Sequence, residues 1–164
     1  MLTVHHLGIS QSERIVWLCE ELGLDYQLVR YERRADNRLA PDEYKALHPM
    51  GIAPVITDGD LVLGESGAIC EYLCRRHGGG RLSPGPEHPD FADHLFWFHW
   101  SNGTFMTTLM MQLVLARGEG NPAAAFVADR SQHGWTMVEK RIGERPAYQR
   151  AMAKAEPGMT PMLA

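Results

Sequence analysis

The sequence of 164 residues has few cysteines, no excess of positive charge and no long apolar run. Its 3 cysteines lack the number and spacing of a disulfide framework, which favours a reducing compartment and makes the cytoplasm the expected location. A formal net charge of −4 argues against broad nucleic-acid binding, which needs a clustered basic face. No apolar run approaches the ~20 residues that cross a bilayer, and residues 1–6 do not resemble a signal peptide. We therefore expect neither a nucleic-acid nor a membrane partner.

The rest of the composition is that of an ordinary globular protein, with 45% hydrophobic and 22% charged residues. A chain of this length can bury one good core or two small ones. Arg33, Arg34 and Arg38 form a local basic cluster, but acidic residues are interleaved with them. We expect a solvated loop there.

Residues 1–78 predict a compact α/β unit. Apolar residues recur at helical spacing up to Leu22, and Gly23 can supply a left-handed residue at the C-terminal end of this helix. Two apolar runs flank Asp58-Gly59, which is a strong signal for a hairpin with a type I′ turn. The expected order is a strand at 2–7, a helix ending at 22, a strand at 26–31, a short helix at 41–47, the hairpin at 55–63, and a helix capped by Ser66.

Residues 79–89 are rich in glycine and proline and are predicted to form a linker. After the linker the pattern is helical, so residues 90–164 are predicted to form an all-helical domain. One long amphipathic helix is expected over 91–116, with Asn102 and Gly103 in its interior. Further helices are expected to begin at Asn121-Pro122 and near Pro146.

The segment from Ser10 to Glu13 opens the first predicted helix and has two interpretations. Ser10 and Glu13 have the spacing of a capping box, which would satisfy orphan backbone donors. The same place suits chemistry, because a helix N-terminus attracts anions and a hydroxyl beside it can donate to a thiolate. A hydrogen bond to a charged acceptor supplies ~1.5–3 kcal/mol, enough to lower a thiol pKa by about two units.

Two later segments also combine a structural and a functional interpretation. Pro54 could simply start a strand, or it could be a cis-proline that holds the backbone of Val55 outward to pair with an extended peptide. Ser66 could cap a helix, or its hydroxyl could bind a carboxylate while Glu65 binds an ammonium group. Together, Glu65 and Ser66 would recognise an amino-acid head group.

Three stretches resemble, in order and spacing, the signature regions of glutathione transferases: residues 5–26, HPMGIAPVI at 48–56 and LGESGAICEYL at 63–73. The resemblance covers nearly all of residues 1–78 and continues more loosely through 91–117 and 145–148. It implies a thioredoxin-like α/β domain at 1–78 that binds glutathione, followed by an all-α C-terminal domain. The expected co-substrate is glutathione.

The resemblance also implies roles for individual residues. Pro54 and Val55 would pair with the glutathione backbone, and Glu65 and Ser66 would hold its γ-glutamyl end. The activating hydroxyl would lie at the start of the first helix, with Ser10 as first choice and Ser12 as second, and Gln11 could also donate a hydrogen bond there. The electrophile pocket would be lined by His99, Asn102 and Phe105.

Departures from the family pattern occur in the site and in the helical domain. Many relatives carry a lysine where Ile52 stands, so one contact to the glycyl carboxylate is missing or supplied elsewhere. When residues are counted back from Gly23 without gaps, the activating serine of the serine-type glutathione transferases falls nearer Ile9 than Ser10.

The helical domain is expected to be incomplete. Nothing between Trp135 and Pro146 can supply the additional helices of relatives, so helices are expected to be lacking near 139–141. Without those helices, the apolar stripe of the long helix would be exposed, which is rare in monomers. Either a homodimer covers this stripe, or the helices belong to the protein and are missing from the given sequence.

Cysteine and metal chemistry are not expected. Cys19 lies on the apolar stripe of the first helix, and Cys70 and Cys74 are four apart on one helix face rather than in a Cys-x-x-Cys motif. The histidines lack ligand spacing, so no metal site is predicted.

The leading hypothesis is a glutathione transferase that joins the thiolate of glutathione to electrophilic small molecules in detoxification. The alternative is a catalytically weak relative that serves as a binding or scaffolding protein. Ile52 and the short helical domain favour the alternative, whereas the Pro54-Val55 and Glu65-Ser66 pairs favour ligand binding in either case.

Overall fold

The structure is a computed structural model that describes residues 1–115, 128, 131–132, 135–136, 138 and 145–158. These residues divide between two compact units. The first holds residues 1–83 together with the described C-terminal helix, and the second holds the described residues between 84 and 143. No helix of the described residues is both long and apolar enough to cross a membrane.

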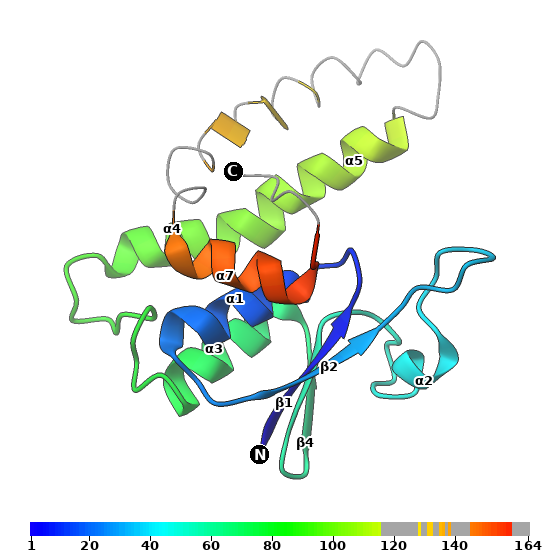
Figure 1. The fold of residues 1–164 in the computed structure, drawn as a ribbon. Coiled ribbons are helices and arrows are strands. Elements are labelled where there is room, and N and C mark those ends of the chain that lie inside the picture. Colours follow the sequence, from blue (N-terminus) through cyan, green and yellow to red (C-terminus); the bar gives the residue numbers. More distant parts are fainter. Residues whose placement is uncertain (116–127, 129–130, 133–134, 137, 139–144, 159–164) are drawn as a thin grey trace. The chain divides into compact units, whose positions relative to one another are not determined.

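The first unit is built on a mixed sheet of four strands, β1 (Leu2–Leu7), β2 (Gln27–Tyr31), β3 (Val55–Asp58) and β4 (Leu61–Gly64). The strand order is β2-β1-β3-β4, with β1 and β2 parallel and the other pairs antiparallel. Helix α1 (Glu13–Leu22) connects the parallel pair, α2 (Asp42–Lys45) precedes the hairpin, and α3 (Ser66–Arg76) follows it (Figure 1). This arrangement confirms the predicted thioredoxin-like domain.

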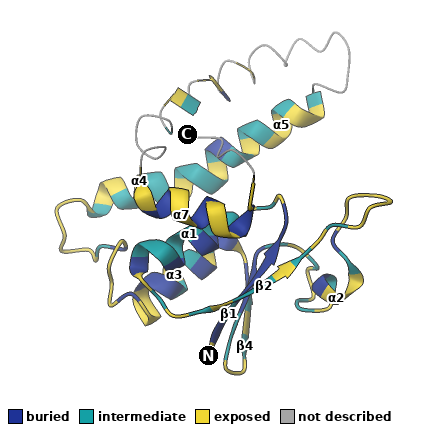
Figure 2. Ribbon diagram, in the orientation of Figure 1, coloured by how far each residue is buried: buried dark blue, intermediate teal, exposed yellow. Residues whose placement is uncertain are grey.

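The two faces of β1 pack against different helices, because successive side chains of a strand point to opposite faces. Leu2 and Val4 join the main core with α1 and α3, whereas Leu7 joins a smaller cluster around Tyr44 of α2. Most of β1 is buried (Figure 2). By the same alternation His6 shares the α1 face with Val4, while the neighbouring His5 lies on the α2 face.

Helix α7 (Pro146–Ala155) packs against α1 and belongs to the first unit. Ala151 and Ala155 are 0% exposed and contribute to the main core. The rings of Trp17 and Tyr148 meet edge to face with centroids 5.0 Å apart. The sequence predicted this helix but placed it in the helical domain of residues 90–164. In the structure its small residues bring it onto α1 and so carry the C-terminal segment to the sheet.

Ion pairs reinforce the contact between α7 and α1. Arg145 Nε donates to Glu21 Oε1 at 2.6 Å, and Lys154 Nζ donates to Glu20 Oε1. These pairs are partly exposed, so apolar packing rather than charge carries most of the stability of the contact.

The second unit contains one continuous helical segment made of α4 (Phe91–Trp100), η1 (Ser101–Met106) and α5 (Thr107–Leu115). The predicted long helix is confirmed, and its middle turn is a π-helix that includes Asn102 and Gly103. The Thr107 hydroxyl donates to the Asn102 carbonyl at 3.2 Å in the wider turn. π-Helical turns occur frequently at functional sites.

The hairpin differs from the prediction by one residue. Its strands end at Asp58 and begin again at Leu61, so the central turn residues are Gly59 and Asp60 rather than Asp58-Gly59. Only Gly59 of these two has positive φ, at 60°, which is the pattern of a type II′ turn and not of type I′. The helix predicted to begin at Asn121-Pro122 and the helices expected to be lacking near 139–141 lie outside the described residues.

Candidate functional site

The Ser12 hydroxyl at the start of α1 is fully buried and is shared among several partners. Its Oγ lies 2.8 Å from Nδ1 of His6 and 2.7 Å from Oγ of Ser10, and it accepts the backbone N–H of Leu7 at 3.2 Å. The helix itself starts at Glu13, and Ser12 makes no side-chain cap bond. Ser12 therefore links strand β1 to the first turn of α1 instead of capping the helix.

Ser10 is partly exposed and lies beside Ser12. Its hydroxyl donates to the Leu7 carbonyl at 2.7 Å and accepts the backbone N–H of Ser12 at 3.2 Å. The predicted bond from the Glu13 backbone N–H to this hydroxyl is replaced by a bond to the Ser10 carbonyl at 3.3 Å. The capping box fails because the Ser10 hydroxyl is engaged closer to the strand.

The loop before Ser10 is held from two sides. Ile9 has φ of 53°, a strained conformation for a β-branched residue, so the surrounding structure must impose it. Its backbone N–H donates to Glu156 Oε1 at 2.6 Å, and its carbonyl accepts from Arg33 Nη2 at 2.9 Å. Arg33 also donates from Nε to the Gly8 carbonyl at 2.7 Å.

The expectation of a solvated loop around the basic cluster is therefore wrong for Arg33. The rest of the cluster is more exposed, and Arg34 pairs with Asp36 in water. The buried Gly8 would leave a costly unpaired carbonyl without a donor, and the Arg33 guanidinium supplies that donor together with one to the Ile9 carbonyl.

Helix α3 places Ser66 next to residues of α1 and the loop before it. Arg14 Nη1 donates to Ser66 Oγ at 3.3 Å, and the Ser66 hydroxyl donates to Gln11 Oε1 at 3.5 Å. The predicted cap at Ser66 is wrong, because α3 starts at this residue and Glu65 takes the cap position without a side-chain cap bond. Glu65 is exposed and has φ of 65°, another strained position beside the site.

The Pro54-Val55 segment joins the sheet next to β1. The Ala53–Pro54 peptide bond is cis, as the cis-proline interpretation predicts. Val55 begins β3, where it pairs with His5 on one side and Gly64 on the other, and it is 1% exposed. The Pro54-Val55 and Glu65-Ser66 segments, both predicted to hold glutathione, therefore belong to the same unit as Ser10.

Titratable groups around the start of α1 have shifted pKa values. Burial lowers the pKa of His6, and the charge of Arg30 lowers it further, while Glu156 and the Ala155 backbone oppose this change. Burial and the neighbouring Glu156 carboxyl raise the pKa of Glu13 to about 7. The site thus contains a histidine that favours its neutral form and an acid that titrates near neutral pH.

The cysteines of the first unit are unreactive thiols. Burial raises the pKa of Cys19 to about 12 and that of Cys70 to about 11, so both stay protonated at neutral pH. All three cysteines are free. Within the described part of the chain, no group of three or more histidine, cysteine, aspartate or glutamate side chains could hold a metal ion.

The predicted electrophile-pocket residues all lie in the second unit. His99 is exposed at the end of α4, and Asn102 is half-buried in the π-helical turn. Phe105 is 8% exposed, stacks on Trp100 at 5.0 Å and meets Trp135 edge to face at 5.4 Å. Phe105 thus contributes to the packing of that unit.

Sequence reasoning missed Arg33, His6 and Glu156. His6 was considered only as a metal ligand, although its place on the α1 side of β1 follows from the strand period. Glu156 lies 150 residues from His6 along the chain, and no local pattern connects them. Their contact depends on the packing of α7.

Residues 10–76 match the family profile described as the N-terminal domain of glutathione S-transferase. A crystal structure of a glutathione S-transferase from Actinobacillus pleuropneumoniae is 30% identical to this chain, with a TM-score of 0.80. That similarity covers 94% of this chain and 93% of the other. The chain belongs to the glutathione S-transferase family.

Further glutathione S-transferases agree with this assignment. Glutathione S-transferase 3 of Schizosaccharomyces pombe is 35% identical over 115 residues, which is 70% of this chain and 47% of that protein. The chain spans about half the length of the yeast relatives that it matches. A glutathione transferase family member from Pseudomonas fluorescens, described with two glutathione bound, shares the fold at 18% identity, with a TM-score of 0.66 and coverage of 96% of this chain and 79% of that one.

The match to the glutathione S-transferase N-terminal domain spans every residue predicted to activate or hold glutathione: Ser10, Gln11, Ser12, Pro54, Val55, Glu65 and Ser66. Arg14 and Arg33 also lie within it. His6 and Glu156 lie outside it.

Proposed function

We propose that the protein joins the thiolate of glutathione to electrophilic small molecules, with Ser10 donating a hydrogen bond to the thiolate. The observation that most supports this role is the difference in exposure between the two candidate hydroxyls, Ser10 and Ser12. Ser12 is 0% exposed and bonded to His6, whereas Ser10 is partly exposed at the start of α1. A ligand can reach Ser10 without rearranging the core, so Ser10 takes the direct role and Ser12 supports it.

The energetics of this role are sufficient. Lowering a thiol pKa by about two units requires roughly 2.7 kcal/mol. A hydrogen bond to a charged acceptor contributes about 1.5–3 kcal/mol, and the N-terminal end of a helix contributes about 0.3–1 kcal/mol more. One hydroxyl at the start of α1 can therefore keep much of the bound thiol ionised at neutral pH.

The remaining contacts to glutathione follow from the family resemblance. Ser66 and Glu65 would hold the γ-glutamyl end, and the contacts of Ser66 with Arg14 and Gln11 support a polar subsite at that point. Pro54 and Val55 would pair with the peptide backbone of glutathione.

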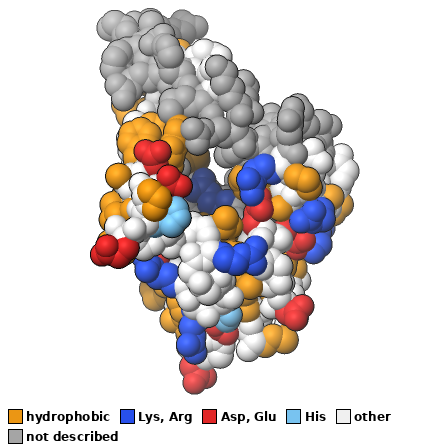
Figure 3. Space-filling model, turned by 90° about the vertical axis from the view of Figure 1, so that its left-hand side faces the viewer, with side chains coloured by type: hydrophobic (Ala, Val, Ile, Leu, Met, Phe, Trp, Pro, Cys, Tyr) orange, Lys and Arg blue, Asp and Glu red, His pale blue; other side chains and the backbone are white. Residues whose placement is uncertain are grey.

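Charged side chains of both signs are interspersed on the face drawn in Figure 3, which agrees with a small ligand better than with a polyanion. His99, Asn102 and Phe105 would shape the pocket for the electrophile. We further propose a homodimer that works in the cytoplasm in detoxification.

The proposal is tested by retention on immobilised glutathione, followed by conjugation of a chromogenic aryl halide. We expect the protein to be retained, to be eluted by free glutathione, and to turn over the electrophile. Retention without turnover would favour a binding or scaffolding protein instead. A protein that is not retained and shows no turnover would contradict both functions.

A further inference from the structure

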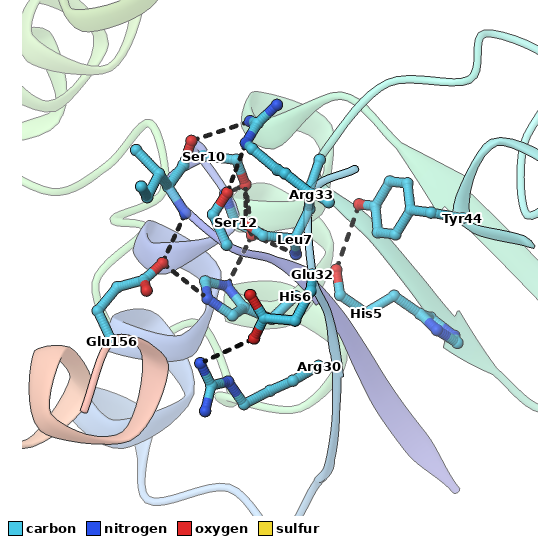
Figure 4. A network of polar contacts seen from close by, with 12 residues as sticks. His5, His6, Leu7, Ser10, Ser12, Arg30, Glu32, Arg33, Tyr44 and Glu156 are labelled. Atoms are coloured by element: carbon cyan, nitrogen blue, oxygen red, sulfur yellow. Dashed lines mark hydrogen bonds and ion pairs between the residues drawn. The ribbon is translucent and has the colours of Figure 1, made fainter. Parts of the chain in front are cut away.

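A continuous chain of hydrogen-bonding atoms leads from Ser10 to Glu156, the residue after α7 (Figure 4). Ser10 Oγ lies 2.7 Å from Ser12 Oγ, and Ser12 Oγ lies 2.8 Å from His6 Nδ1. On the other side of the ring, His6 Nε2 lies 3.2 Å from Glu156 Oε1. The chain crosses from the start of α1 through β1 to the end of α7, within the first unit.

Only the Ser10 end of this chain is open to a ligand bound at the start of α1. Ser12 and His6 are 0% exposed, and Glu156 is 8% exposed. A ligand beside Ser10 can therefore contact neither Ser12 nor His6. A hydrogen-bonded path from His6 to such a ligand must therefore pass through the two hydroxyls.

The positions of the protons in this chain depend on the state of His6. Glu156 Oε1 already accepts the Ile9 N–H, so it acts as an acceptor and the proton of a neutral His6 belongs at Nε2. Nδ1 then accepts the Ser12 hydroxyl proton, and Ser12 Oγ can accept the proton of Ser10. In this state both hydroxyl protons point inward, because the Ser10 hydroxyl donates either to the Leu7 carbonyl at 2.7 Å or to Ser12 Oγ at 2.7 Å.

A second proton on His6 reverses the direction of the chain. Nδ1 then donates to Ser12 Oγ, Ser12 donates to Ser10 Oγ, and the Ser10 hydroxyl proton points outward. An outward proton on Ser10 is what a thiolate beside it requires. The protonated form of His6 is thus the form that matches a bound thiolate.

The charges around His6 suit a group that is neutral at rest and is stabilised once it is protonated. Burial and Arg30 lower the pKa of His6, so it is neutral before a ligand binds. The Glu156 carboxylate beside Nε2 stabilises the imidazolium. The charged and titratable groups that surround the pair are Glu13, whose carboxyl interacts with Glu156, Arg14 beside Glu13, and Arg30, which pairs with Glu32 at 3.6 Å.

We propose that the thiol proton of bound glutathione passes through Ser10 and Ser12 to His6, and that Glu156 holds the resulting imidazolium. The S–H bond breaks as Ser10 Oγ takes that proton; Ser10 gives its own proton to Ser12 Oγ, and Ser12 gives its proton to His6 Nδ1. Nothing is oxidised or reduced. When the sulfur has bonded to the electrophile and the leaving group has departed, the proton returns by the same path to water.

The inference rests on the proposed function, since it needs glutathione beside Ser10. His6 and Glu156 touch no reacting atom and are positioning residues that act through the hydroxyls.

The test is a nitrogen-15 NMR spectrum of the full chain with labelled histidines near neutral pH. The signals of His6 are assigned among the 8 histidines with a His6→Asn variant. Spectra are taken alone, with saturating glutathione, and with S-methylglutathione, which has no thiol proton. Ultraviolet absorbance of the thiolate is followed on the same samples.

We expect glutathione, but not S-methylglutathione, to convert His6 to the imidazolium as the thiolate forms. A thiolate that forms while His6 stays neutral would overturn the relay and leave the proposed function intact. Absence of glutathione binding or of a thiolate would overturn both.

Kinetics of two variants give a second measurement. An asparagine at position 6 can still accept the Ser12 hydroxyl proton as a hydrogen bond, but it cannot take up a proton. We expect His6→Asn to raise the apparent pKa of the bound thiol and to lower turnover on the order of 100-fold. Its affinity for S-methylglutathione should be unchanged.

The matched control is His5→Asn. His5 is the adjacent histidine of β1, also buried, but it lies on the α2 face and contacts Tyr31 and Thr57. This variant should leave the thiol pKa and turnover as they are. Equal effects of the two variants on the thiol pKa would contradict the relay.

Discussion

The Arg33 guanidinium donates from Nη2 to the Ile9 carbonyl at 2.9 Å, although 24 residues separate the two along the chain. Together with its bond from Nε to the Gly8 carbonyl, this contact fixes the strained loop that ends at Ser10. A side chain from the segment after β2 thus sets the position of the hydroxyl at the start of α1.

Replacing Arg33 with lysine should lower turnover on the order of 10- to 100-fold, because an ammonium cannot supply the two fixed donors and the hydroxyl shifts. Steady-state kinetics of glutathione conjugation measure the effect. The control is Arg34→Lys, since Arg34 is exposed and pairs only with Asp36 among the contacts described for its side chain. Equal losses in the two variants would show that the loop is not held in this way.

Replacing Ser66 with alanine should weaken glutathione binding by about 1–3 kcal/mol, because a charged carboxylate would lose a buried donor. Titration calorimetry with glutathione measures the change. Ser83→Ala serves as the control, since Ser83 is also buried and in the first unit but lies in the loop after α3. An unchanged affinity in Ser66→Ala would remove this residue from the binding site.

Glu13 should make stability depend on pH near neutrality. Burial and the Glu156 carboxyl raise its pKa from 4.5 to about 7, so the folded protein holds this proton more tightly than the unfolded chain. That contribution to stability is complete below the unfolded pKa and is lost as the pH rises through about 7. A Glu13→Gln variant cannot ionise, so it should gain stability relative to the natural sequence as the pH rises.

Urea unfolding midpoints of the two proteins, compared across this pH window, test the prediction. Glu71→Gln provides the control, because Glu71 is exposed on α3 and pairs with Arg75 one turn away. A difference in unfolding midpoint between Glu13→Gln and the natural sequence that is the same at every pH would contradict this account of Glu13.

Much of the first unit could be predicted from the sequence because its signals are local. The helical spacing that ends at Leu22, the left-handed Gly23 and the alternation along β1 each depend on residues close in the chain. The cis-proline at Pro54 followed from a local motif. Such features need no knowledge of how distant segments pack.

The capping roles predicted for Ser10 and Ser66 failed because other partners compete for their hydroxyls. At Ser10 the competitors are the Leu7 carbonyl and Ser12, and at Ser66 they are Gln11 and Arg14. A sequence shows that a hydroxyl stands near a helix start but not which tertiary partner lies within hydrogen-bonding distance. The role of Glu156 was hidden for the same reason.

The most direct test of the account is the apparent pKa of the glutathione thiol bound to the natural sequence and to Ser10→Ala. It is measured from the ultraviolet absorbance of the thiolate against pH, with S-methylglutathione as the blank. For the natural sequence we predict a value about two units below the ~8.5 of a free thiol. Ser10→Ala should return the pKa most of the way to that value with little change in glutathione affinity. An unchanged thiol pKa in Ser10→Ala would contradict the account, and a rise confined to Ser12→Ala would assign the direct role to Ser12 instead.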